Sequence, residues 1–370
     1  MPRDVTIIGA GLGGLLLARV LSLQGMDATV FEADHSPMAR AQGGMLDIHE
    51  NDGQAALEAA GLTAEFRSLI LEGRQAMRFL DRDGRVLFEK PDDGTGGRPE
   101  VQRGELRQML LDSLPPGTVR WGRKLIGVQA LGAGRHEVVF SDGSREVASL
   151  LVGADGAWSR VRPLLTPAVP APTGMSILET FLFEADTRYP DTAKAVGGGF
   201  MGALASGRAI MAHRERGDTL HAYTLITGRL DGATDAIAQI VQAFDGWAPE
   251  LTALLTETDV APVLRPTHSL PVGQRWARVP GVTLLGDAAH LAPPNGEGAN
   301  LALFDGAELA RLLAAQPDDP EAALATFEAA MFERSAASAT EGAGFYDTLM
   351  SEDPARDLIA MVTQHAQITS

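Results

Sequence analysis

The 370-residue sequence contains no cysteine. This absence excludes disulfide bonds, cysteine-ligated zinc, iron–sulfur clusters and a thiol nucleophile. Basic residues are also few, with 31 Lys and Arg against 48 Asp and Glu and a formal net charge of −17. Nucleic acids and anionic membranes are bound through basic faces, so neither is expected as a partner. The net charge does not restrict a small ligand, because local charge can differ from the mean.

Long apolar runs are missing as well. The longest, residues 5–18, is interrupted by four glycines and is too short to span a bilayer. No basic segment of the kind found in signal peptides precedes it. We therefore expect a cytoplasmic protein without an integral membrane segment. Hydrophobic residues make up 45% of the chain, which is enough to bury large cores, and the length predicts about two domains.

The N-terminal residues predict a βαβ unit. Residues 4–8 (DVTII) have the composition of a buried strand, and the apolar spacing of LLLARVLSLQ at 15–24 indicates a helix. ATVFEA at 28–33 follows as a second strand. Between the first strand and the helix lies a glycine-rich loop.

This loop carries the pattern G-x-G-x-x-G, formed by Gly9, Gly11 and Gly14. The first glycine allows a tight turn, the second lets a pyrophosphate approach the backbone, and the third allows the helix to pack on the strand. Glu32 closes the second strand, where an acid binds a ribose hydroxyl in dinucleotide sites. Strand, helix and acid are all in place, so we predict a dinucleotide site. Residues 197–202 match the same pattern without a preceding strand, and we interpret them as an irregular strand or turn.

Two later strands end in a short acid next to glycine. Asp155-Gly156 follows the apolar segment LLVG, and Gly286-Asp287 follows VTLL. Ligands of open α/β sheets bind at the carboxyl ends of the strands, so both pairs are candidates for a cofactor site. The Gly-rich run after Asp287 and the helix expected at 300–315 offer backbone N–H groups and a positive dipole end.

The remaining pattern indicates one domain interrupted by another. We predict a hairpin at 76–89, a helix at 103–114, strands near 118–128 and 135–141, a proline-rich linker at 163–172, alternating strands with one helix between 173 and 270, and helices after Pro320. The predicted fold class is α/β: a Rossmann-like domain, an inserted mixed β-sheet domain and a C-terminal bridging helix. We assign 1–70, 98–167 and 272–318 to the first domain, 71–97 and 168–271 to the inserted substrate-binding domain, and 319–370 to a C-terminal helical region.

The three elements Gly9–Gly14, Asp155-Gly156 and Gly286-Asp287, in this order and spacing, resemble those of the class A FAD-dependent monooxygenases, the aromatic hydroxylase family. The resemblance covers nearly the whole chain. Within that family the sequence is most similar to the tetracycline-inactivating flavin monooxygenases. The segments that carry this similarity are ARAQGGMLDIHENDGQAALEAAGL at 39–62, VQRGELRQMLLDSL at 101–114 and GDAAHLAPP at 286–294.

The resemblance implies roles for particular residues. Arg40 would lie at the reactive edge of the flavin and act in catalysis. Glu32 would bind the adenosine ribose, Arg103 and Arg107 the linker or phosphates, and Asp287 the ribityl-pyrophosphate region. The full set of implied FAD-binding residues is Gly9, Gly11, Leu12, Gly14, Glu32, Ala33, Arg40, Asp47, Arg103, Arg107, Asp155, Gly156, Gly286, Asp287, Pro294, Gly296, Gly298, Ala299 and Asn300.

The resemblance also implies the reaction. NADPH, or NADH in its place, would reduce FAD, O₂ would form a C4a-hydroperoxyflavin, and one oxygen atom would pass to an aromatic or polycyclic small molecule. The cofactor supplies the difficult chemistry, and the protein orients it and excludes water. A flavin-dependent dehydrogenase or oxidase, and a non-catalytic flavoprotein that sequesters a ligand, remain alternatives. A halogenase is disfavoured because W-x-W-x-I-P is missing. We expect a monomer or weak dimer.

The chain departs from the family pattern in the flavin loop and in the substrate domain. Glu297 stands where many relatives have Gln, and the loop between Pro294 and Gly296 is one residue shorter than in the tetracycline enzymes. His221 falls where the tetracycline enzymes have a substrate-facing histidine. Phe200 stands where they have a substrate-binding arginine, so a fixed positive charge is missing there. A less anionic polycycle or another aromatic is therefore as plausible a substrate as tetracycline.

Several of these residues also have simpler interpretations. His221 on an alternating strand is compatible with a purely structural role, and Arg40 with an ordinary surface position. Arg103 and Arg107 place two positive charges at a helix start, which is unfavourable unless an anion is bound there. His290 lies close to Asp287, but no further ligands are evident, so we expect a hydrogen-bonded histidine and no metal.

Overall fold

The computed structural model describes residues 4–39, 43–92, 94, 97–228, 230, 236–293 and 295–368, with side chains up to residue 363. The chain forms two compact units. The first unit comprises Met1–Ile70, Val101–Ala171 and His268–Thr340, and the second Leu71–Glu100, Pro172–Thr267 and Glu341–Ser370. The C-terminal region expected at 319–370 is thus shared between the two units. The functional roles assigned to the domains stay predictions.

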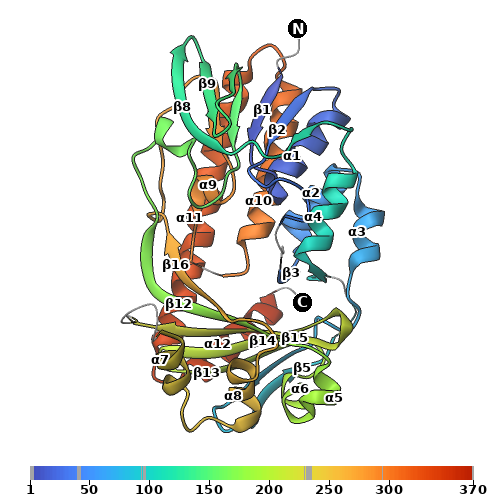
Figure 1. Ribbon diagram of the computed structural model, residues 1–370, viewed down its shortest axis with the longest axis vertical. Helices are drawn as coiled ribbons and strands as arrows, with labels where there is room; N and C mark the ends of the chain where they lie inside the picture. The colour runs from blue at the N-terminus through green and yellow to red at the C-terminus, as the bar shows by residue number, and fades with distance from the viewer. Residues whose placement is uncertain are drawn as a thin grey trace. The chain divides into compact units, whose positions relative to one another are not determined.

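The first unit is built on a parallel five-stranded sheet (Figure 1). Its strand order is β17 (Val282–Leu284), β11 (Leu151–Gly153), β1 (Val5–Ile8), β2 (Ala28–Phe31) and β7 (Val119–Arg120). Every residue of β1, β11 and β17 is buried, as expected when helices or loops cover both faces of a parallel sheet. The chain leaves β1 towards β2 on one side, while β11 pairs with β1 on the other, so β1 marks the switch point at which such sheets bind ligands.

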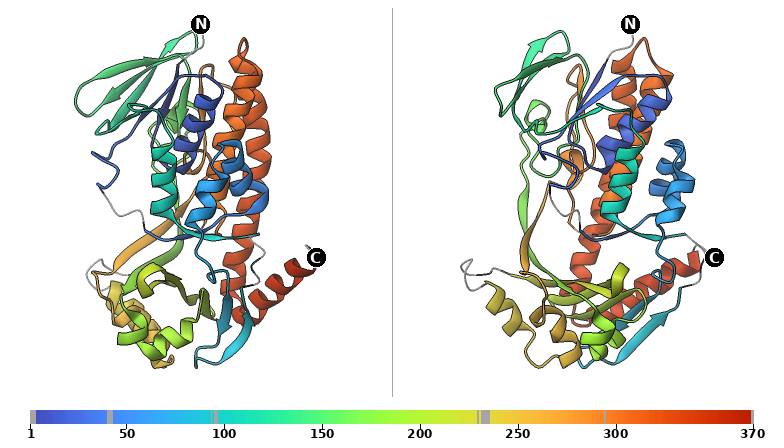
Figure 2. Two further views of the ribbon diagram at one scale, coloured as in Figure 1. Left: turned by 90° about the vertical axis from the view of Figure 1, so that its right-hand side faces the viewer. Right: turned by 45° about the vertical axis from the view of Figure 1, so that its right-hand side comes forward.

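Two helices cross at very short range in this unit. Helix α1 (Leu12–Leu23) packs on α10 (Gly298–Ala315). A Cβ atom at Gly13 would lie 2.5 Å from the carbonyl oxygen of Ala302, and one at Gly306 would lie 2.5 Å from that of Gly13. Glycine on both helices therefore permits the crossing. Helix α11 (Pro320–Met350) runs beside α10 over its first part (Figure 2), and Arg334 is hydrogen-bonded to Asp305 there.

Smaller elements complete the first unit. A three-stranded antiparallel sheet follows β7, and a two-stranded sheet pairs β3 with β6, which begins at the last residue of a second-unit segment. The bounds are β3 Met45–Asp47, η1 Glu50–Gln54 (a π-helix), α2 Ala55–Ala59, α3 Thr63–Leu69, β6 Glu100–Gln102, α4 Arg103–Asp112, β8 Leu125–Gly132, β9 Arg135–Phe140, β10 Arg145–Ala148, η2 Arg162–Leu164 and α9 Asp287–His290.

The second unit holds a mixed seven-stranded sheet, as predicted for the inserted domain (Figure 1). Its order is β16 (Val263–Ser269), β12 (Ala171–Leu182), β15 (Thr219–Thr227), β14 (Arg208–Glu215), β13 (Phe200–Ala205), β4 (Met77–Leu80) and β5 (Val86–Lys90). The pair β13–β4 is parallel, and β4–β5 is the expected hairpin. The helical segments are α5 Ala185–Arg188, α6 Pro190–Val196, η3 Arg216–Asp218, α7 Ala236–Ala243, α8 Pro249–Thr256 and α12 Pro354–Ile368.

The prediction of a single helix between 173 and 270 was wrong. Besides α7, the structure has α5, α6 and α8 in this region. Helix α6 has only seven residues and buries Thr192, Ala193 and Val196, which form too short a pattern for recognition by periodicity. The second G-x-G-x-x-G match joins the end of α6 to β13, which confirms the interpretation as turn and strand.

A histidine between two glutamates is buried in the second unit. His221 has no exposed surface, its Nε2 lies 2.9 Å from Glu179 Oε1, and its Nδ1 lies 2.7 Å from Glu215 Oε1. Phe181 stacks on the imidazole at a centroid distance of 3.9 Å, and Arg265 pairs with the second oxygen of Glu179. Burial alone would lower the pKa of His221, but the hydrogen bonds and charges of the two glutamates outweigh it and raise the pKa. This geometry fits a structural role and gives no support to the predicted substrate contact.

His221→Gln should destabilise the second unit by about 3 kcal/mol near pH 6, because two buried carboxylates lose their shared cation. A raised pKa means that this stabilisation is complete below the unfolded-state value of about 6.5 and is lost as pH rises through the folded-state value. Calorimetry should therefore show the gap between wild type and variant closing as pH rises.

His136→Gln is the matched control. His136 is also buried, but burial lowers its pKa. The difference in unfolding free energy between wild type and His136→Gln should therefore stay constant above about pH 6.5. A His221 gap that is constant or widens with pH would contradict a charged imidazole.

Candidate active site

A cavity of about 920 Å³ lies in the first unit, at the carboxyl ends of four parallel strands. Gly9 follows β1, Glu32 follows β2, Asp155 follows β11, and Gly286 follows β17. The loop before α10 supplies a further wall. Of the residues predicted from the sequence, those lining the cavity are Gly9, Gly11, Leu12, Gly14, Glu32, Ala33, Arg103, Asp155, Gly156, Gly286, Asp287, Gly296, Gly298 and Ala299.

The three glycines of the first loop meet different constraints. Gly9 has a φ of +106°, and a Cβ there would lie 2.3 Å from the carbonyl oxygen of Ala154. A Cβ at Gly14 would lie 2.3 Å from the carbonyl oxygen of Gly9, whereas a Cβ at Gly11 would meet nothing within 4 Å. Gly9 and Gly14 are therefore required by packing, and Gly11 keeps the cavity open.

The start of α1 is available to an anion. Its N-cap, Gly11, has no side chain that could cap the helix, and the first turn has no acidic residue. The free N–H groups and the helix dipole therefore favour a phosphate at this end of the cavity.

Glu32 holds the same loop in place. Its carboxylate accepts hydrogen bonds from the N–H of Ala10 at 2.7 Å and from the N–H of Asp34 at 2.9 Å. The side chain is buried but lines the cavity, so its remaining lone pairs can accept from a ribose hydroxyl. The ribose contact itself stays a prediction.

Asp155 offers an acceptor that no described residue uses. One carboxylate oxygen accepts from the N–H of Arg160 at 2.7 Å, while Oδ1 is buried without a hydrogen-bond partner in the described part of the chain. Burial raises the pKa of Asp155 despite the hydrogen bonds that it accepts from Ser159 and Arg160. An oxygen on a cavity wall that lacks a protein donor can accept from a ligand or from water.

A buried carboxylate on α10 fixes the opposite wall. Asp305 has no exposed surface and accepts from the N–H of Gly286 at 3.0 Å and from Arg334 at 2.7 Å. His290 Nε2 lies 2.6 Å from Asp305 Oδ2, so the histidine is hydrogen-bonded as expected. Burial would raise the pKa of Asp305 and lower that of His290, but their mutual attraction outweighs burial in both. Arg334 further lowers the pKa of Asp305, and Asp287 further raises that of His290.

Cationic side chains gather around the cavity although the protein is strongly acidic. Arg103, Arg123, Lys124 and Arg160 all line it. Arg123 is paired with Asp142 at 2.7 Å, but no salt bridge involves the other three within the described residues. Such cations, the open helix end at Gly11 and the unsatisfied Asp155 oxygen fit a dianionic pyrophosphate joined to hydroxyl-bearing and heterocyclic groups, as in FAD.

Comparison with known proteins supports the same cofactor. Residues 3–339 match the FAD binding domain family, FAD_binding_3. The chain belongs to this family. Monooxygenase penA of Penicillium thymicola is 30% identical over 367 residues, covering 84% of each chain. The predicted enzyme class, an FAD-dependent monooxygenase, is thereby confirmed, as is the resemblance to the flavin hydroxylases.

Solved structures share the fold of this FAD-binding monooxygenase. Klebsiella pneumoniae HpxO complexed with FAD and uric acid superposes with a TM-score of 0.80 at 23% identity, covering 98% of this chain and 92% of that one. The tetracycline destructase Tet(51) gives a TM-score of 0.75 at 18% identity, covering 100% and 98%. The α/β fold class is confirmed by these likenesses, and at such identities they carry no further conclusion.

Three of the predicted FAD-binding residues do not line the cavity. Arg107 is buried, and its guanidinium donates to the carbonyl oxygens of Ala10 and Pro37. Asn300 is fully buried and joins the backbone of Asp47 to that of His49. Asp47 itself contacts the His49 ring. In this structure their polar groups support the loops around the cavity, and their predicted contact with FAD stays a prediction.

The predicted roles of three further residues stay predictions. Arg40 and Pro294 lie outside the described residues. Phe200 lies in the second unit, at 5.0 Å between ring centroids from His213. Among the described residues, no helix is both long enough and apolar enough to cross a membrane.

Arg162 was missed by the sequence analysis. Its buried guanidinium donates to the carbonyl oxygens of Ala157, Asp287 and Ala288, and so ties the loop after β11 to the loop after β17. Burial lowers its pKa, opposed by Asp155 and Asp287. A charged residue in the otherwise apolar run that follows a cofactor loop was the available signal.

Gly11→Ala should weaken FAD binding about tenfold while leaving the thermal midpoint of the apoprotein unchanged, because the methyl enters cavity space rather than the core. The backbone at Gly11 (φ −77°) accommodates alanine. Gly14→Ala, which overlaps the Gly9 carbonyl, should instead cost about 2 kcal/mol of folding stability. Fluorescence titration and thermal unfolding of the apoproteins distinguish the two effects, and unaltered FAD affinity in Gly11→Ala would refute this reading of the loop.

Asp305→Asn should lower the free energy of unfolding by about 3–5 kcal/mol, because His290 and Arg334 lose the charge that compensates them. Urea unfolding measures the free energy of unfolding of each variant. The FAD content of each purified protein is measured beside it. Glu308→Gln on the same helix is the control. Its ion pair among the described residues is with the exposed Arg311, with a weaker attraction to Arg334, so the change in stability should be less than about 1 kcal/mol. Equal losses in the two variants would argue against the role of Asp305.

Proposed function

We propose that this protein is an NAD(P)H-dependent FAD monooxygenase that transfers one oxygen atom from O₂ to an aromatic or polycyclic small molecule. NADPH is the reductant that we propose, with NADH as the variant to be tested beside it. The observation that carries the proposal is the cavity in the first unit. Its Gly11 opening, its cationic lining and its unsatisfied Asp155 oxygen suit FAD.

The chain's own groups would hold the cofactor at both ends. The start of α1 and Arg103 would bind the pyrophosphate, Glu32 a ribose hydroxyl, and Asp155 and Asp287 the hydroxyl and ring donors further along. Bound FAD would accept a hydride from the nicotinamide and would then activate oxygen. The protein's task is then to orient the cofactor and keep water out, for which rigid loops tied by Arg162 and Asp305 are suited.

The substrate class is proposed from the second unit and from the relatives. Phe200, His213 and Tyr223 share one face of the seven-stranded sheet and are partly exposed. Flat rings pack well against such a row. HpxO is complexed with uric acid, and Tet(51) is a tetracycline destructase. Because Phe200 provides no cation for an anionic group, we propose phenols, nitrogen heteroaromatics and weakly anionic polycycles ahead of tetracycline itself.

A substrate panel tests the proposal. NADPH and NADH oxidation should be stimulated by at least one member of a set of phenols, purines, anthracyclines and tetracyclines under ¹⁸O₂. Mass spectrometry should then find a product that contains one labelled oxygen atom. Oxidation that yields only hydrogen peroxide across the panel would indicate an oxidase, and tight ligand binding without turnover would indicate a sequestering flavoprotein. Either result contradicts monooxygenation.

A further inference from the structure

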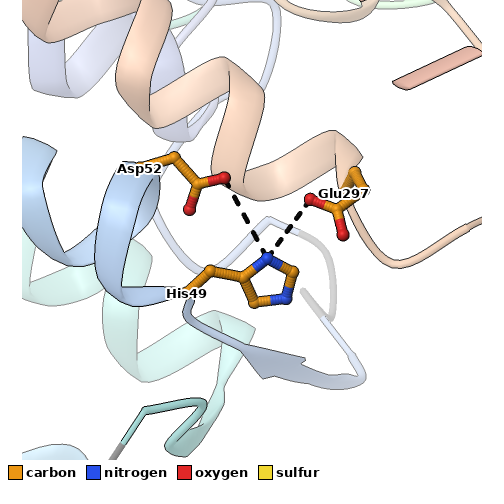
Figure 3. A group of neighbouring side chains, drawn as sticks. All are labelled: His49, Asp52 and Glu297. Carbon is orange, nitrogen blue, oxygen red and sulfur yellow. Dashed lines mark ion pairs between the residues drawn. The ribbon is translucent and has the colours of Figure 1, made fainter. Parts of the chain in front are cut away.

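The loop that precedes α10 places a carboxylate against a histidine (Figure 3). Glu297 Oε2 lies 3.2 Å from His49 Nδ1, and Asp52 Oδ2 lies 4.0 Å from the same nitrogen. The other ring nitrogen, Nε2, lies 3.0 Å from Asp47 Oδ2. All four side chains are between 15% and 28% exposed, so solvent screens these charges only in part.

Both nitrogens of His49 face carboxylate oxygens, which only accept hydrogen bonds when ionised. A neutral imidazole has a proton on one nitrogen and a lone pair on the other. In either tautomer, that lone pair would point at a carboxylate. A proton on each nitrogen removes this repulsion and gives a donor to Asp47 and a donor to Glu297. The arrangement, with Asp47 on one ring nitrogen and Glu297 on the other, is that of an imidazolium between carboxylates.

This ion pair borders the FAD cavity without lining it. Gly296 and Gly298 are cavity residues, and Glu297 between them is the N-cap of α10. The first turn of α10 has no acidic residue, and Glu297 makes no capping bond to it. The ion pair of Glu297 and His49 thus stands at the positive end of the helix dipole, behind a wall of the cofactor site.

We propose that Glu297 and His49 set the reduction potential of bound FAD with opposite signs. Reduction adds electrons to the flavin, so the Glu297 carboxylate disfavours the reduced form, and the His49 imidazolium favours it. The pair is a positioning and tuning device that touches no reacting atom. The inference rests on the part of the proposed function that places the flavin ring near Gly296 and Gly298.

The test is the midpoint potential of FAD in the purified holoenzyme, measured against a reference dye during slow enzymatic reduction. Glu297→Gln should raise the equilibrium constant for two-electron reduction about fivefold, about 20 mV upward. His49→Gln should lower it by a similar factor. The double variant should return close to wild type, because both charges are absent. Glu65→Gln, an exposed carboxylate on α3, is the control and should leave the potential unchanged.

The opposite signs separate charge tuning from loss of structure. Both single variants break the same ion pair, so a merely structural role predicts shifts in one direction or equal loss of FAD. A second readout is the FAD content of each purified variant, which a charge effect leaves unchanged and a structural role lowers in both. Shifts of one sign, or an equal loss of FAD in both variants, overturn the proposal.

The three side chains His49, Asp52 and Glu297 could also hold a metal ion, since their ligand atoms lie within 4.8 Å of one another. The potential is therefore measured with and without EDTA. If EDTA moves the wild-type potential to the His49→Gln value, a bound metal ion rather than a proton supplies the positive charge, and the proposal is overturned. The readout requires only bound, reducible FAD, so it is independent of whether the substrate panel yields an oxygenated product.

Discussion

A single buried carboxylate, Asp305, joins three segments that form the far wall of the FAD cavity. Its two oxygens accept from the Gly286 backbone, His290 and Arg334, and so connect the loop after β17, α9 and α11 to α10. A charge with no exposed surface is tolerable only because two cations and a backbone donor surround it. Since Gly286 precedes Asp287 and the cofactor loop, the position of this wall depends on that compensation.

The same principle operates on the other walls, where buried arginines bind carbonyl oxygens. Arg107 donates to Ala10 in the first glycine loop, and Arg162 donates to residues of the loops after β11 and β17. The chain thereby cross-links segments far apart in sequence. Arg103, Lys124 and Arg160, by contrast, line the cavity. Basic residues therefore have two distinct uses: those that donate to carbonyls shape the site, and those that face the cavity favour an anionic cofactor.

How far the sequence could predict this site depended on whether a requirement was local. Gly9, Gly14 and Glu32 were found because a tight turn and a strand end impose residue types at fixed spacing. The supporting role of Arg107 and Asn300 was not predicted, because it depends on carbonyl groups that only the fold brings near. The contact between His49 and Glu297 joins residues about 250 positions apart, so no local pattern could have indicated it.

Glu297 was notable in the sequence only as a substitution for glutamine. In the structure its loop has separate anchors: the Glu297 N–H donates to Asn295, and the Asn295 amide donates to Ser338 on α11. The shape of the loop therefore does not require the ion pair with His49. A charge that is not needed for shape, yet stands at a helix N-terminus beside a redox cofactor, acts mainly through its electric field. Replacing a neutral amide by a carboxylate at this position would by itself oppose flavin reduction, and the imidazolium of His49 offsets that opposition.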